Sequence, residues 1–138
     1  MLYLVILGIL GFYFINLVGS YLAIRAVIFQ KPSRGTIPLP VVSRMEKTRI
    51  SAGNRSLDAR IRRVADDSPV IIIFHGQGEV VDMWAACQEA FAEAGFSTLV
   101  FDYSGFGASS GAGARGLGVL PCDSQAVLQA SAALIPGN

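Results

Sequence analysis

The sequence predicts an α/β protein in which an N-terminal transmembrane helix precedes a β-hairpin and a parallel βαβ unit, arranged in three layers. Three observations predict this class. The first 24 residues carry no charged side chain, residues 47–64 contain two short strand-like segments, and residues 70–102 run from a β-branched strand through a helical segment to a second apolar strand. Of the 138 residues, 52% are hydrophobic and 15% are charged, which excludes a disordered chain.

Charge is distributed unevenly along the chain. The net charge of +1 provides no global field that attracts polyanions, so we expect no nucleic-acid partner. Ten of the eleven basic residues lie between residues 25 and 63, whereas eight of the ten acidic residues lie beyond residue 63. Cys87 and Cys122 lack CxxC spacing, which indicates free thiols. We expect no metal and no cofactor.

Residues 2–24 are predicted to cross a lipid bilayer. At 1.5 Å per residue, 24 residues span about 36 Å, more than the hydrocarbon core of about 30 Å. A cleaved secretory signal is the alternative, but it requires a basic segment before a shorter apolar stretch. Arg25, Lys31 and Arg34 instead follow the apolar run, so the positive-inside rule predicts a single-pass membrane protein whose C-terminal part is cytoplasmic.

The rest of the chain divides by composition. Residues 1–30 form the anchor, and residues 31–45 form a linker because Pro32, Pro38 and Pro40 disfavour both helix and central strand. Residues 46–138 are the α/β part. It opens with strands at 47–51 and 57–64 around a Gly53-Asn54 turn, which we expect to be edge strands with one solvated face. Apolar Leu57, Ala59 and Ile61 alternate there with Asp58, Arg60 and Arg62.

The βαβ unit follows. Residues 70–74 are apolar without alternation, which predicts a strand buried on both faces. A helix is expected from Asp82, as N-cap, to Gly95, and a second strand at 97–102. The two strands are predicted to be parallel with a right-handed connection. A Gly-rich loop at 103–118 and a helix at 121–135 complete the chain.

Two motifs follow the two strands, where ligands bind in open α/β sheets. They are His75-Gly76-Gln77-Gly78 and the segment from Asp102 to Ser109. Gly76 and Gly78 permit a tight turn whose backbone N–H groups point at a phosphate or an oxyanion. The alternative is that these glycines only turn the chain after a buried strand.

This order of elements and motifs resembles the first half of an α/β-hydrolase fold over residues 46–138, and in particular the membrane-anchored α/β-hydrolase-domain proteins. The resemblance implies that the complete form is a serine hydrolase of ester, thioester or amide bonds, acting on a small-molecule or acyl substrate. It assigns the first oxyanion-hole donor to the backbone N–H of Gln77. The supporting residues are His75, Gly76 and Gly78, and the second strand-end motif comprises Asp102, Tyr103, Gly105, Gly107 and Ser109.

The sequence departs from the family at the catalytic residues. The family's nucleophile lies in a G-x-S-x-G elbow after the next strand. This spacing occurs in the sequence at Gly107-Ala108-Ser109-Ser110-Gly111, but it lies in the Gly-rich loop after the strand at 97–102 and not after a later strand. We therefore expect no catalytic residue in this chain and no activity from it. Ser109 is a weak nucleophile candidate. The resemblance gives His75, the sole histidine, a structural place beside the oxyanion turn, and Asp102 is not the triad acid.

Two other functions are compatible with the sequence. A dinucleotide-binding module is suggested because Gly76 and Gly78 follow a strand and Asp102 lies 26 residues after Gly76, close to the position of a ribose-binding acid. Against it, Val81 replaces the third glycine and Glu79 places negative charge where a pyrophosphate would bind. The third possibility is an inactive, truncated protein with an interaction role at the membrane.

Overall fold

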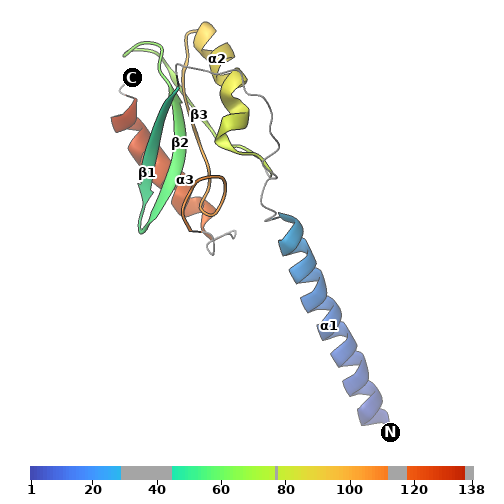
Figure 1. Cartoon of the computed structure of the whole chain (residues 1–138). Coiled ribbons are helices and arrows are strands. Elements are labelled where there is room, and N and C mark those ends of the chain that lie inside the picture. The colour runs from blue at the N-terminus through green and yellow to red at the C-terminus, as the bar shows by residue number, and fades with distance from the viewer. Residues whose placement is uncertain (29–44, 77, 112–117, 136–138) are drawn as a thin grey trace. The chain divides into compact units, whose positions relative to one another are not determined.

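The structure, a computed structural model, describes residues 1–28, 45–76, 78–111 and 118–135 (Figure 1). The chain divides into two units, Met1–Gln30 and Lys31–Asn138. The predicted linker lies outside the described residues except for Met45, and so does Gln77. The division of residues 31–138 into a linker and a domain stays a prediction.

The first unit contains one helix, α1 (Leu2–Ile28), which includes the predicted segment 2–24 and extends four residues beyond it. Its surface is apolar on all sides, and the Asn16 amide donates to the Phe12 carbonyl over 2.9 Å. That bond satisfies a polar side chain within the helix itself. The helix is long and apolar enough to cross a membrane.

The second unit is built on a four-stranded mixed sheet of order β1-β2-β4-β3. Its strands are β1 (Glu46–Ala52), β2 (Arg55–Arg62), β3 (Val70–Ile73) and β4 (Ser97–Phe101). The first two form the predicted antiparallel hairpin, with Gly53 in its turn at φ 64°. β4 pairs antiparallel with β2 and parallel with β3, so the predicted parallel βαβ unit is confirmed.

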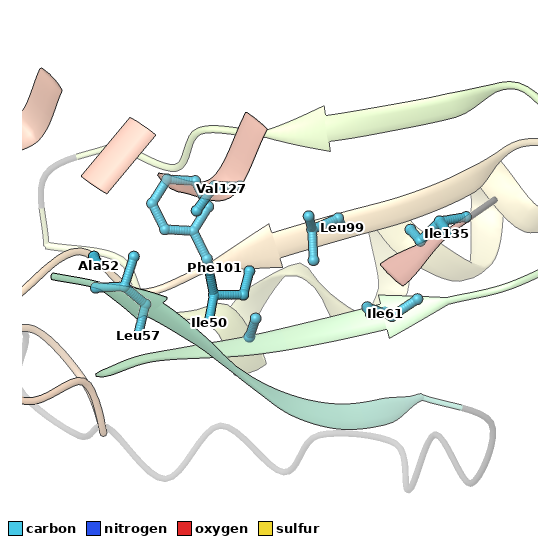
Figure 2. Close-up of a cluster of buried hydrophobic side chains, with 9 residues drawn as sticks. Ile50, Ala52, Leu57, Ile61, Leu99, Phe101, Val127 and Ile135 are labelled. Atoms are coloured by element: carbon cyan, nitrogen blue, oxygen red, sulfur yellow. The ribbon is translucent and has the colours of Figure 1, made fainter. Parts of the chain in front are cut away.

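Helices cover both faces of this sheet, which confirms the three-layer arrangement (Figure 1). On one face, α3 (Leu120–Leu134) contributes Val127 to a core in which Phe101 and Leu99 are fully buried. Figure 2 shows this cluster between the strands and the helix. On the other face, Ile73 and Val100 pack against Val81 of η1 (Val81–Trp84), the one-turn 3₁₀ helix that leads into α2 (Ala85–Glu93).

The prediction of a solvated face on β2 is wrong. Asp58 and Arg60 are each only 7% exposed, because β4 makes β2 an interior strand and η1 lies over that face. The Arg60 guanidinium lies 2.9 Å from Asp58 Oδ2 and 3.0 Å from Asp82 Oδ1. Buried charges are tolerated when they are paired in this way, and the alternating pattern alone could not reveal the pairing.

Asp82 is consequently not the predicted N-cap. It lies inside η1, and its carboxylate binds Arg60 rather than a backbone N–H of its own helix. The carboxylate of Asp102, from the end of β4, accepts the Val81 N–H over 2.9 Å instead. A residue distant in sequence therefore accepts a backbone N–H that has no partner within the helix.

β3 is less buried than predicted. Val70, Ile71 and Ile72 are partly buried and only Ile73 is buried, while Phe74, just after the strand, is 45% exposed. Within the described residues β3 is an outer strand, with β4 as its one neighbour.

The uneven distribution of charge along the sequence is balanced within the fold. Five arginines of the basic region form ion pairs with carboxylates, and most of those carboxylates come from later in the chain. The pairs are Arg49–Asp58, Arg55–Asp123, Arg60 with Asp58 and Asp82, Arg62–Glu89 and Arg63–Glu46.

The buried pair on β2 predicts a large difference between two arginine substitutions. Arg60→Ala leaves Asp58 buried without its closest cation, which is expected to lower the free energy of unfolding by about 3 kcal/mol. Arg63→Ala removes a pair whose side chains are 41% and 53% exposed, and its expected cost is below about 1 kcal/mol. Urea unfolding of the two variants in detergent measures both values, and equal costs would contradict the buried-pair interpretation.

Candidate functional site

The candidate site lies at the carboxyl ends of the parallel strands β3 and β4, where both predicted motifs begin. His75 is 5% exposed and Asp102 is 1% exposed, and His75 Nε2 lies 3.4 Å from Asp102 Oδ1. That separation is an ion-pair distance without the alignment of a hydrogen bond. Nδ1 lies 3.0 Å from the Gly76 carbonyl oxygen, and the ring packs edge-on against Tyr103 at 5.0 Å.

The surroundings of His75 favour its protonated form. Burial lowers the pKa of His75, but Asp102, the Gly76 carbonyl and the charge of Glu79 together outweigh burial and raise the pKa above 6.5. When protonated, His75 donates from Nδ1 to the Gly76 carbonyl and pairs electrostatically with the Asp102 carboxylate through Nε2. This geometry suits the structural place that the resemblance assigns to His75.

Asp102 connects three segments of the site. Besides accepting the Val81 N–H, its carboxylate lies 3.4 Å from the Ala108 nitrogen. Gly107 passes so close, at φ +49°, that a Cβ there would lie 1.7 Å from Asp102 Oδ2. The glycine therefore allows the loop after β4 to pack directly against the carboxylate. Because Asp102 is buried, its carboxylate is not accessible to a ribose hydroxyl.

Glu79 occupies the turn after β3. Its Oε2 accepts the Gly76 N–H over 2.7 Å and the Trp84 indole N–H over 3.2 Å. The resemblance assigns an anion-facing role to this turn, but the anion that contacts Gly76 in the structure is the chain's own carboxylate. Gly78 follows at φ +78°. The predicted oxyanion donor, Gln77, lies outside the described residues.

The serines of the loop are engaged in bonds that hold the loop. Ser109 Oγ donates to the Asp102 carbonyl over 2.6 Å and accepts the Asp58 N–H over 2.8 Å. Ser110 Oγ accepts the Ser56 N–H over 2.7 Å. Neither hydroxyl has a hydrogen bond to His75 among the described residues, so the geometry does not activate Ser109 as a nucleophile.

Sequence reasoning missed a second buried carboxylate beside the site. Asp123, at the start of α3, has no exposed surface. Its two oxygens accept the Ser104 N–H over 2.8 Å and the Ser104 hydroxyl over 2.9 Å. Arg55 completes the group by donating to Ser104 Oγ at 2.8 Å and to Asp123 at 3.2 Å.

A signal for Asp123 was present in the sequence. It precedes Val127 by four residues, so the helical repeat places a carboxylate on the buried face of the predicted helix. Its charge also affects the loop, since burial and the nearby Asp123 together raise the pKa of Tyr103 above 10.0.

The described residues contain no group of three or more His, Cys, Asp or Glu side chains that could hold a metal ion. Cys87 is partly buried, Cys122 is exposed, and both are free thiols, as predicted.

The contact between Gly107 and Asp102 gives a prediction for the loop. Gly107→Ala adds a methyl group that collides with the carboxylate and strains the backbone, and the expected loss of unfolding free energy is about 3 kcal/mol. Gly53→Ala is the matched control, because Gly53 also has a positive φ, of +64°, but no atom within 4 Å of an added Cβ. Its expected cost is the backbone strain alone, about 1 kcal/mol. Thermal unfolding of both variants measures the difference, and equal melting temperatures would refute the close approach.

Comparisons with known proteins bear on the fold of this chain. A family model described as the alpha/beta hydrolase fold matches residues 69–130. Among solved structures, Est1E from Butyrivibrio proteoclasticus, determined with ferulic acid bound, superposes with a TM-score of 0.60 at 24% sequence identity. The match covers 66% of this chain and 39% of Est1E, and at this identity it shows a shared fold.

Curated relatives match a shorter segment. Two proteins from Escherichia coli, each described as an uncharacterized 31.7 kDa protein in the traX-finO intergenic region, are 48% identical over 44 residues. The match covers 31% of this chain and 15% of each relative. The family match over residues 69–130 and the fold shared with Est1E, together with the strand order β1-β2-β4-β3, support an α/β-hydrolase domain, and the described residues fit the N-terminal part of that fold.

Proposed function

We propose that the complete domain is a serine hydrolase that cleaves ester, thioester or amide bonds, and that the turn after β3 and the loop after β4 form the oxyanion side of its active site. The observation that carries this proposal is the contact between the two strand ends. The turn after β3 and the glycine loop after β4 meet at one edge of the sheet, where Asp102 contacts His75, Val81 and Ala108. Active sites of open α/β sheets lie at this edge.

The proposed oxyanion donor is the backbone N–H of Gln77, as the motif implies. A preorganised backbone N–H aimed at the developing negative charge contributes about 3 kcal/mol to the transition state of acyl transfer. Preorganisation requires that the flanking residues be fixed. His75 is buried between Asp102 and the Gly76 carbonyl, and Gly76 is bonded to Glu79 on the other side, which supports that role for the turn.

Among the residues that the structure describes, no nucleophile is paired with a base. The one histidine is held by Gly76 and Asp102, and the hydroxyls of Ser104, Ser109 and Ser110 bind other partners. A serine hydroxyl without an adjacent base is a weak nucleophile at neutral pH. We therefore propose that this chain alone is inactive.

Labelling with a fluorophosphonate tests this proposal. The purified 138-residue chain is expected to remain unmodified, whereas a longer version that carries a nucleophile elbow after the next strand is expected to be labelled at the serine of that elbow. Intact-mass spectrometry measures both. Labelling of the short chain that disappears in Ser109→Ala, but persists in Ser110→Ala, would identify Ser109 as the nucleophile and overturn the assignment.

The observed geometry disfavours the dinucleotide alternative. A pyrophosphate would have to displace the Glu79 carboxylate from the Gly76 N–H, and a ribose would have to reach Asp102, which is buried and already bonded. Both requirements oppose binding of a polyanion.

We also propose that α1 anchors the protein in a membrane, with the C-terminal part in the cytoplasm. The length of α1, the absence of charged side chains from Leu2 to Ile24 and the presence of Arg25 in its last turn support this proposal. The anchored protein keeps its full mass of 14.6 kDa, whereas cleavage as a secretory signal would remove most of α1.

Membrane extraction tests the anchor. The wild-type chain is expected to stay in the pellet after alkaline carbonate treatment. Leu10→Arg places a charge in the middle of α1 at a cost of about 3 kcal/mol and is expected to release part of the protein into the supernatant. Leu10→Ala is the matched control and is expected to stay in the pellet. Release of the wild type, or a shortened mass, would contradict anchoring.

A further inference from the structure

Glu79 contacts the turn after β3 through both its carboxylate and its backbone. One of its oxygens, Oε2, accepts both the Gly76 N–H at 2.7 Å and the Trp84 indole N–H at 3.2 Å. The Glu79 backbone N–H reaches the Gly76 carbonyl at 3.4 Å. The backbone N–H and the backbone carbonyl of Gly76 therefore both form hydrogen bonds with Glu79.

These two donors form the kind of site that binds an external anion. Backbone N–H groups in a glycine turn and an indole N–H both donate to carboxylates and phosphates, and bonds to a charged acceptor are shorter and stronger than neutral ones. The 2.7 Å separation between Gly76 N and Glu79 Oε2 is in the range of a charge-assisted bond. The chain thus supplies its own anion at the position where a ligand's anion would bind.

The charges around the turn increase the repulsion of a second anion. Asp102 lies behind His75, and the carboxylate of Asp82 is engaged with Arg60 rather than with the turn. The cation next to the turn is His75 when protonated, and it faces Asp102 and Glu79, which both raise its pKa. An external anion would meet two carboxylates, with no arginine or lysine bonded to the turn among the described residues.

We propose that Glu79 is an intramolecular ligand that determines specificity at this turn: it occupies the Gly76 and Trp84 donors and so excludes the carboxylates and phosphates of external molecules from those two N–H groups. The consequence for substrate choice rests on the proposed function. In a hydrolase, it selects acyl substrates that are neutral next to the scissile carbonyl.

Anion binding to the full chain tests this inference without any catalysis. Trp84 is the only tryptophan, so its indole N–H gives a single resonance in the ¹H–¹⁵N spectrum of the protein in detergent. Sodium acetate and, separately, inorganic phosphate are titrated against sodium chloride at matched ionic strength. The wild type is expected to show no saturable shift of this resonance.

Glu79→Ala frees both donors and is expected to bind acetate with a saturable shift, at least about tenfold more tightly than the wild type. Glu79→Gln keeps an oxygen for the same donors without the charge, and it is expected to bind acetate with intermediate affinity. Because the glutamine is close in shape to glutamate, this variant remains informative if the alanine variant does not fold.

Glu93→Ala is the matched control, because it removes the same charge from an exposed position at the end of α2. It is expected to behave as the wild type. A saturable acetate shift in the wild type or in Glu93→Ala, or none in either Glu79 variant, would overturn the inference. Since no turnover is measured, these outcomes are independent of whether the longer protein is labelled by a fluorophosphonate.

Discussion

The carboxylate of Asp102 is the contact on which the arrangement of the site depends. It is almost completely buried, yet it reaches the start of η1, the glycine loop and the histidine of the neighbouring turn. A buried carboxylate is stable only when donors surround it, so the three segments must be in place together. Gly107 is part of the same constraint, since any side chain there would occupy the position of the carboxylate.

Much of the fold followed from local patterns. The hairpin was predictable from alternation around Gly53-Asn54, and the parallel pair from the apolar run at 70–74 and the second strand at 97–102, because these signals are short in range. The positions of both motifs at strand ends followed from the same elements. What the patterns could not show was the burial of Asp58 and Arg60, which depends on β4 joining the hairpin from about forty residues away.

The polar contacts of the site were also beyond sequence reasoning. Asp82 has the chemistry of an N-cap, but its carboxylate is used by Arg60, and Asp102 satisfies the helix start in its place. Glu79 was recognised as an unfavourable charge for a pyrophosphate, and the structure adds the two donors that hold it. Such partners are brought together by the fold, so spacing along the chain does not identify them.

The ion pairs between the hairpin and later residues have a consequence for synthesis of the chain. Arg60, Arg62 and Arg55 meet their partners 22, 27 and 68 residues further on. While the polypeptide is being made, the guanidinium groups of Arg55 and Arg62 emerge from the ribosome before their carboxylate partners, whereas Arg60 follows Asp58 and gains only its second partner, Asp82, later. The nascent segment behind α1 is therefore strongly cationic during the interval in which a translocon would sort the helix. Under the proposed anchoring, this excess of positive charge is present while the helix is being oriented, and the ion pairs of the finished fold neutralise part of it afterwards.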